Sequence, residues 1–133
     1  MRVSEGMSQV ILSVGPSHTL RDAARMMAEK RTGAALVIDE ESPGPRIITE
    51  RDILLSIGGG EDPDSERVAD HMSDSVIAAT TEWSLERAAT EMSRRGIRHL
   101  VVYDGRELVG VLSMRDIVRV WTTEGATSGM TPD

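Results

Sequence analysis

The string ITERDIL at Ile48–Leu54 occurs a second time, slightly altered, as LSMRDIV at Leu112–Val118. Both strings carry Arg-Asp-Ile at the centre, a hydroxyl residue three positions before the aspartate, and branched aliphatic residues at the two ends. Each string is typical of a buried strand that runs directly into a helix. Two such strings predict two copies of one structural unit if the surrounding sequence is duplicated as well.

The duplication extends well beyond the two strings. A shift of 65 positions aligns Met7-Ser8 with Met72-Ser73, Thr19-Leu20 with Ser84-Leu85, Ala23-Ala24 with Ala88-Ala89, Met27 with Met92, and Val37 with Val102. One dropped residue then changes the shift to 64 and brings ITERDIL onto LSMRDIV. A period this long that occurs twice predicts a tandem pair and not a solenoid.

Each copy predicts the same order of elements. An apolar stretch at residues 9–14 or 75–80 precedes a polar loop, and Thr19 or Ser84 then provides the N-cap of an amphipathic helix. Continuous apolar runs at residues 34–39 and 99–104 predict strands that are buried on both faces. A turn and a second strand lead into the helix that begins at Glu50 or Met114. The order strand-helix-strand-strand-helix predicts an α/β (α+β) fold.

The duplication also gives the expected boundaries. Residues 7–57 form the first repeat, residues 58–71 a linker with a short helix, and residues 72–121 the second repeat. Residues 122–133 carry no periodicity and are expected to form a mobile tail. Because the chain has 133 residues in all, it is expected to form one domain, or two very small ones that share a core.

Composition argues against several classes of function. The net charge of -7, from 15 basic and 22 acidic residues, opposes binding to a nucleic-acid backbone. The lack of cysteine excludes disulfides and thiolate chemistry, and the longest aliphatic run is too short to cross a bilayer. His18, His71 and His99 have no metal-ligand spacing with one another, and no catalytic constellation is recognisable. We therefore expect a soluble, cytoplasmic protein that is not an enzyme, binds no metal and contacts neither nucleic acid nor membrane.

The architecture and the repeated Ser/Thr-x-x-Asp motif resemble the cystathionine β-synthase (CBS) domain. The similarity covers roughly Met7–Trp121, and both copies carry Val-x-Asp at a strand end and Thr/Ser-x-Arg-Asp-Ile after the following turn. It implies a stand-alone tandem CBS pair whose repeats pack with pseudo-twofold symmetry. It also implies clefts between the repeats that hold an adenosine ligand such as AMP, ADP, ATP or S-adenosylmethionine, with no cofactor required.

Two motifs are the first candidates for ligand binding: Thr49, Arg51 and Asp52 in the first copy, and Ser113, Arg115 and Asp116 in the second. The resemblance implies that each aspartate accepts hydrogen bonds from ribose and that the Thr or Ser hydroxyl contacts ribose or phosphate. An ionised carboxylate is acceptor-only and suits a diol. The same spacing is that of a helix capping box, which also occurs at Thr19–Asp22 with no implied ligand role. Both interpretations stay open.

Further candidates lie beside the strands. The resemblance implies that Arg98-His99 contacts ligand phosphates, and the alternative is a solvated charge pair that caps the end of a strand. The first copy has Gly33-Ala34 at that place. The first strands contribute Ile11, Leu12, Val14, Val76, Ile77 and Ala78, which either contact an adenine ring or belong to the core. Gly110 fits the family pattern, but the equivalent Arg46 either blocks the first cleft or binds phosphate.

Two functions are compatible with these patterns. The first is a regulatory sensor that binds an adenosine ligand in a cleft between the repeats. The second is a dimerisation or docking module with vestigial clefts that acts on an unidentified enzyme or transporter. The resemblance implies a homodimer formed through the helices that begin at Glu50 and Met114.

Overall fold

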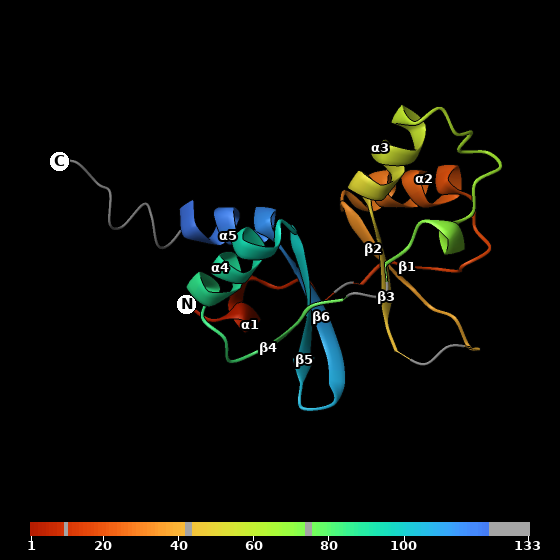
Figure 1. Ribbon diagram of the computed structural model, residues 1–133. Coiled ribbons are helices and arrows are strands. Elements are labelled where there is room, and N and C mark those ends of the chain that lie inside the picture. Colours follow the sequence, from red (N-terminus) through yellow and green to blue (C-terminus); the bar gives the residue numbers. More distant parts are fainter. Residues whose placement is uncertain (10, 42–43, 74–75, 123–133) are drawn as a thin grey trace. The chain divides into compact units, whose positions relative to one another are not determined.

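Two sheets of three strands each, with the helices that accompany them, make up the computed structural model (Figure 1). The structure describes residues 1–9, 11–41, 44–73 and 76–122, so the predicted tail lies outside the described residues except for Thr122. The chain divides into two compact units. Ile11–Val76 form the first-repeat unit, and the residues before and after this segment form the second-repeat unit.

The first-repeat unit contains the strands β1 (Ser13–Val14), β2 (Ala34–Val37) and β3 (Arg46–Thr49), the helices α2 (Leu20–Lys30) and α3 (Glu50–Gly58), and the 3-10 helix η1 (Val68–Asp70). Strand β1 runs parallel to β2, and β2 runs antiparallel to β3. A parallel pair requires a crossover connection, which α2 provides.

The second-repeat unit repeats this topology. It contains the strands β4 (Ala78–Thr80), β5 (His99–Asp104) and β6 (Glu107–Ser113) and the helices α1 (Val3–Gly6), α4 (Leu85–Arg95) and α5 (Met114–Val120). Strand β4 is parallel to β5, and β5 is antiparallel to β6. The structure thus confirms the predicted α/β fold class and the order strand-helix-strand-strand-helix in both copies.

The helix after the first strand of each copy begins at a side-chain cap, as predicted. Thr19 Oγ1 accepts a hydrogen bond from Asp22 N at 3.1 Å, and Asp22 Oδ2 accepts one from Thr19 N at 3.1 Å. In the second copy Ser84 Oγ accepts from Arg87 N at 3.0 Å. Each cap satisfies an amide that the helix itself leaves without a partner. None of the described helices has the length and apolar character needed to cross a bilayer.

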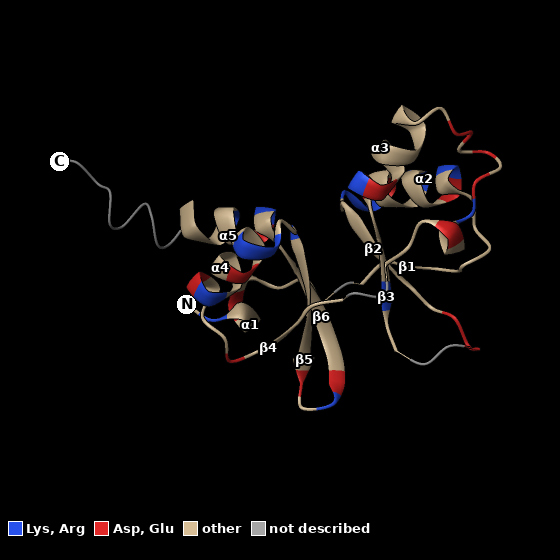
Figure 2. Ribbon diagram, viewed as in Figure 1, with Lys and Arg blue, Asp and Glu red and all other residues tan. Residues whose placement is uncertain are grey.

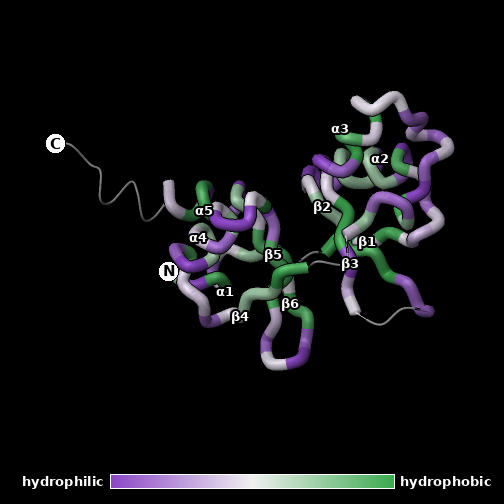
Figure 3. Tube along the Cα trace, viewed as in Figure 1, coloured by the Kyte–Doolittle hydropathy of each residue, from purple (hydrophilic) through white to green (hydrophobic). Residues whose placement is uncertain are grey.

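Each unit has its own apolar core, which the strands and one face of each helix build. Strand β2 is buried along its whole length, and β5 is buried at Leu100, Val101 and Val102, as the continuous apolar runs predict. The methionines at equivalent helix positions, Met27 and Met92, are 4% and 0% exposed and act as packing residues. Figure 3 shows hydrophobic residues along the strands and hydrophilic residues at the β5–β6 hairpin.

Each unit also contains a segment from around the start of the other repeat in the sequence. Ser8 pairs with Val111 of β6 through two backbone hydrogen bonds of 2.9 and 3.1 Å, and Val3 of α1 is fully buried in the second-repeat core. Ser73 pairs in the same way with Ile47 of β3, with bonds of 2.8 and 3.0 Å, and Val68 is buried in the first-repeat core. The boundaries of the sequence repeats therefore differ from the boundaries of the compact units at these segments.

Candidate functional site

The helices α3 and α5 both begin at a capping box formed by the repeated motif. Ser113 Oγ accepts from Asp116 N at 3.0 Å, and Asp116 Oδ2 accepts from Ser113 N at 2.9 Å. Asp52 Oδ2 accepts from Thr49 N at 2.9 Å and from the Thr49 hydroxyl at 3.0 Å, and Thr49 Oγ1 accepts from Asp52 N at 3.4 Å. The capping interpretation is thus confirmed for both motifs. A ligand role for the same carboxylates stays a prediction.

Capping does not use up either carboxylate, because a carboxylate offers about four acceptor positions on its two oxygens. All the hydrogen bonds that the described residues make to Asp52 fall on Oδ2. Asp116 also caps through Oδ2, and its Oδ1 lies 3.5 Å from the Nη2 of the exposed Arg119. Both aspartates are half-buried. Each therefore retains acceptor capacity on Oδ1 while its helix stays capped.

The basic pair predicted from the sequence lies next to the second of these motifs. His99 is the antiparallel partner of Ser113, and Met114 N donates to the carbonyl oxygen of Arg98 at 2.8 Å. The Arg98 side chain is exposed, whereas His99 is half-buried and has contacts of its own. The structure thus brings Arg98, His99, Ser113 and Asp116 to one end of the β5–β6 ladder, and we call this group the second half-site.

The equivalent end of the first sheet has the same backbone frame but the opposite charge. Ala34 pairs with Thr49, and Glu50 N donates to the carbonyl oxygen of Gly33 at 2.8 Å. A Cβ atom at Gly33 would lie 2.9 Å from Glu50 Cδ and 3.0 Å from each carboxylate oxygen. The Glu50 carboxylate therefore covers the position from which Arg98 projects in the second copy. We call Gly33, Ala34, Thr49 and Asp52 the first half-site. The nearby Glu50 carboxylate repels a phosphate, so we expect this half-site to bind anions poorly.

Arg46 of the first copy and Gly110 of the second occupy equivalent positions, as the sequence indicates, but their surroundings differ. Arg46 Nη1 lies 3.8 Å from Asp39 Oδ2, and both side chains are mostly buried. The Arg46 guanidinium is therefore paired with a residue just beyond strand β2 of the same unit. At Gly110 a Cβ atom would lie only 2.6 Å from the backbone oxygen of Ser8, so the crossing N-terminal segment requires a glycine there.

The first-strand candidates separate into core and partly exposed residues. Val14 is 3% exposed and belongs to the first-repeat core, which supports the structural interpretation for this residue. Leu12 and Ile77 are half-buried and pack against the cores, and their carbonyl oxygens accept from Leu36 N at 2.9 Å and Val101 N at 3.1 Å. Of the remaining three candidates, Ile11 and Val76 are half-buried and Ala78 is exposed. Their contact with an adenine ring stays a prediction.

The two arginines inside the motifs lie on the first turns of α3 and α5. Both Arg51 and Arg115 are exposed. Neither is a capping residue, since the caps are made by the residues on either side of them.

Comparison with known proteins decides the family. The family model of the CBS domain matches residues 3–59 and again residues 68–122. The chain belongs to the CBS domain family. The two matches coincide with the two copies found in the sequence, so the chain carries a tandem pair of CBS repeats.

Relatives of this CBS pair differ in length. The CBS domain-containing protein YhcV of Bacillus subtilis is 29% identical over 97% of this chain and 92% of its own length. A Methanopyrus kandleri protein is 31% identical over 89% of this chain, which spans 61% of that protein. Among solved structures, the CBS domain protein PAE2072 from Pyrobaculum aerophilum, complexed with AMP, matches with a TM-score of 0.78 and 32% identity over 96% of this chain and 99% of its own.

One feature of the CBS half-sites could not be found from the sequence. Glu50 is the first residue of a helix, where a glutamate is common. The position of its carboxylate over Gly33 depends on the direction of this one side chain. The indirect signal in the sequence is Gly33, which stands where the second copy has Arg98. A glycine has no side chain and so leaves room there for a neighbouring one.

Proposed function

We propose that this chain is a non-catalytic regulatory module that binds an adenosine-containing ligand, with the second half-site contacting ribose and phosphate. The observation that carries the proposal is the juxtaposition of a basic pair, Arg98-His99, with the Ser113–Asp116 motif at one end of one sheet. The AMP complex of the relative from Pyrobaculum aerophilum supports the ligand class. The family match supports a regulatory role, since CBS domains are generally non-catalytic.

The chemistry of the second half-site suits a nucleoside monophosphate. Asp116 Oδ1 accepts from the ribose hydroxyls, and the Arg98 guanidinium donates to the phosphate. Each hydrogen bond to a charged group contributes about 1.5 to 3 kcal/mol. Three such bonds, with burial of the base, reach the roughly 8 kcal/mol that micromolar binding requires.

Arg98→Ala tests the phosphate contact. We expect the affinity for AMP to fall about 10- to 100-fold, because a charge-assisted bond is lost, while the affinity for adenosine changes little. Isothermal titration with both ligands measures the difference. Arg94→Ala is the matched control, because Arg94 is an exposed arginine of α4 that pairs with Glu91 at 3.4 Å. An equal loss for adenosine and AMP, or no loss for AMP, would contradict the role given to Arg98.

A specific observation favours a second role, that of a homodimer or docking module. Helix α3 exposes Leu54, Leu55 and Ile57, which are 69%, 63% and 49% accessible, and the α5 end of the chain exposes Val118 and Trp121 at 52% and 55%. In Figure 2, α3 carries charged residues only at its N-terminal end. Contiguous exposed aliphatic residues mark an interaction surface. We propose that these helix faces form a homodimer.

Leu55→Glu tests this surface. We expect sedimentation velocity to show a dimer for the wild-type chain at micromolar concentration and a monomer for the variant, because a buried unpaired carboxylate opposes association. Ser93→Glu, which adds the same charge to the exposed side of α4, should leave the dimer intact. A wild-type monomer, or a dimer in both variants, would reject the proposed face. If a monomeric chain binds AMP, the proposed sensor role does not require the homodimer.

A further inference from the structure

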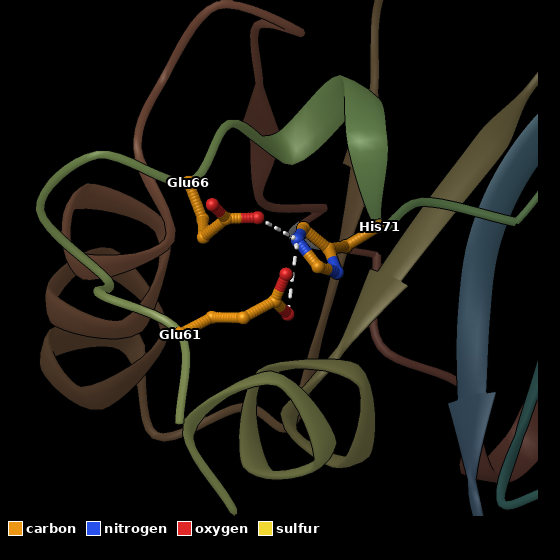
Figure 4. A group of neighbouring side chains, drawn as sticks. All are labelled: Glu61, Glu66 and His71. Atoms are coloured by element: carbon orange, nitrogen blue, oxygen red, sulfur yellow. Dashed lines mark hydrogen bonds and ion pairs between the residues drawn. The ribbon is translucent and has the colours of Figure 1, made fainter. Parts of the chain in front are cut away.

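Three side chains with metal-ligating atoms converge in the segment after α3 (Figure 4). His71 Nε2 lies 2.8 Å from Glu66 Oε1 and 3.9 Å from Glu61 Oε1. One ligand atom from each residue lies within 4.8 Å of the other two. Figure 4 shows both glutamates directed at the same ring nitrogen of His71. All three residues belong to the first-repeat unit, so the group forms within one compact body.

The backbone fixes each of the three residues. Glu61 N donates to the carbonyl oxygen of Ser56 in α3 at 3.1 Å, and Glu66 N donates to that of Asp62 at 2.9 Å. His71 N donates to the carbonyl oxygen of Val68 at 3.0 Å, directly after η1. The group is therefore positioned by hydrogen-bonded turns at all three points.

A buried hydroxyl orients one of the carboxylates. Ser56 is 4% exposed, and its Oγ donates to Glu61 Oε1 at 2.8 Å. Hydrogen bonds of this kind orient ligands around protein-bound metal ions and raise their affinity for the metal. The His71 side chain is 17% exposed and Glu66 is 28% exposed, so the two are partly shielded from water.

The pair of His71 with Glu66 leaves a second carboxylate, that of Glu61, beside the same ring nitrogen. An imidazole Nε2 carries at most one proton, and the nearer of its two carboxylate neighbours is Glu66 at 2.8 Å. Glu61 brings a second negative charge to the same nitrogen, and the two carboxylates repel each other. A divalent cation among the three groups removes this repulsion, because its charge balances both carboxylates.

The distances suit a small divalent ion. Zinc binds nitrogen and oxygen ligands at about 2.0 to 2.2 Å in a tetrahedron, which places ligand atoms roughly 3.4 Å apart. The two distances from His71 Nε2, 2.8 and 3.9 Å, lie on either side of this value. Small side-chain movements would therefore bring one oxygen of each glutamate to a zinc-compatible distance from His71 Nε2.

We propose that Glu61, Glu66 and His71 bind a divalent transition-metal ion of the zinc class. One imidazole nitrogen with two carboxylates favours zinc over magnesium or calcium, which prefer oxygen ligands alone. Glu61 is 46% exposed, so water can reach the group and supply a further ligand. The bound ion ties the segment between the repeats to the end of α3. This inference does not depend on nucleotide binding.

The sequence concealed this group because its ligands are mixed. The spacing of the three histidines predicts no zinc site, and only one histidine takes part here. The ligands recur at intervals of five residues, at 61, 66 and 71, which is neither a helical nor a strand period. Figure 2 shows the acidic character of this segment but not its convergence on His71.

The test uses the untagged full chain, so that no added histidines compete for metal. We expect zinc to bind at one ion per chain and to raise the melting temperature by about 5 to 10 °C at a hundredfold excess over its dissociation constant, while magnesium has little effect. Cobalt bound at the same place should give the visible absorption of a tetrahedral ion. Equilibrium dialysis with metal analysis measures the stoichiometry.

His71→Ala and Glu66→Gln should each weaken zinc binding at least about tenfold. Glu66→Gln retains an oxygen that accepts from His71, so it separates loss of a metal ligand from loss of the fold. His18→Ala, in the same unit but bonded to Gly15 N through Nδ1, should bind zinc like the wild type. Equal zinc affinity in the wild type and both cluster variants, or zinc effects no larger than those of magnesium, would overturn the proposal.

Discussion

Asp116→Ala should weaken binding of AMP by about 10- to 100-fold, whereas Asp22→Ala should leave it unchanged. The expected loss corresponds to one hydrogen bond to a charged group, which contributes about 1.5 to 3 kcal/mol. Both aspartates complete the same capping box, since Asp116 Oδ2 accepts from Ser113 N and Asp22 Oδ2 accepts from Thr19 N. They differ in surroundings, because only Asp116 lies beside Arg98-His99. Isothermal titration at one temperature compares the two variants with the wild type.

The pairing of these variants separates ligand binding from helix capping. Each substitution removes one capping carboxylate, so both should lower the melting temperature by similar amounts. If both variants lost AMP binding equally, the loss would report a weakened fold and the role of Asp116 would be rejected. Wild-type affinity in Asp116→Ala would reject it as well.

Gly110→Ala should reduce the free energy of unfolding by about 3 to 5 kcal/mol, the largest effect on stability that we expect from a single added methyl group. The new Cβ atom would lie 2.6 Å from the backbone oxygen of Ser8 and 3.1 Å from Met7 Sδ. The N-terminal segment must then move away, which breaks the two backbone bonds between Ser8 and Val111. Overpacking costs about 1 to 3 kcal/mol, and each lost bond costs about 1 kcal/mol more. Urea unfolding followed by circular dichroism measures the change.

Gly58→Ala is the matched control for this substitution. No atom lies within 4 Å of a Cβ atom placed at Gly58, which is the last residue of α3. Alanine there should be neutral or stabilising by up to about 1 kcal/mol, because it favours the helix over glycine. A Gly110→Ala protein as stable as the wild type would show that the segment before the first repeat does not pack on β6 as described.

Local features of the fold followed from the sequence. Thr19, Ser84, Thr49 and Ser113 were predicted to precede helices, and each is an N-cap because its hydroxyl accepts from an amide three residues ahead. The buried strands β2 and β5 followed from continuous apolar runs. These features depend on residues close together in the chain, which is why a single sequence reveals them.

The exchange of segments between the repeats did not follow from the sequence. The aligned pairs Met7-Ser8 and Met72-Ser73 indicate that both copies begin alike, but they do not say which sheet each segment joins. Ser8 pairs with Val111 and Ser73 pairs with Ile47 through backbone groups, which every residue type possesses. Side-chain identity therefore carries little information about this pairing.

The sequence predicts part of the candidate site, namely the part that depends on neighbouring strands. The proximity of His99 and Ser113 follows once two consecutive strands are predicted to be antiparallel, because the start of one then lies beside the end of the next. The Glu50 carboxylate over Gly33 and the convergence of Glu61 and Glu66 on His71 depend on side-chain directions and on an irregular segment. Neither leaves a periodic signal in the sequence.

Titration of AMP into the wild-type chain tests the proposed sensor role most directly. We predict saturable binding with a dissociation constant in roughly the micromolar range, and a melting temperature that rises with AMP concentration. ADP, ATP and S-adenosylmethionine in parallel titrations identify the preferred member of the class. A folded chain that shows neither heat nor a change in melting temperature with any of the four ligands would contradict the sensor role.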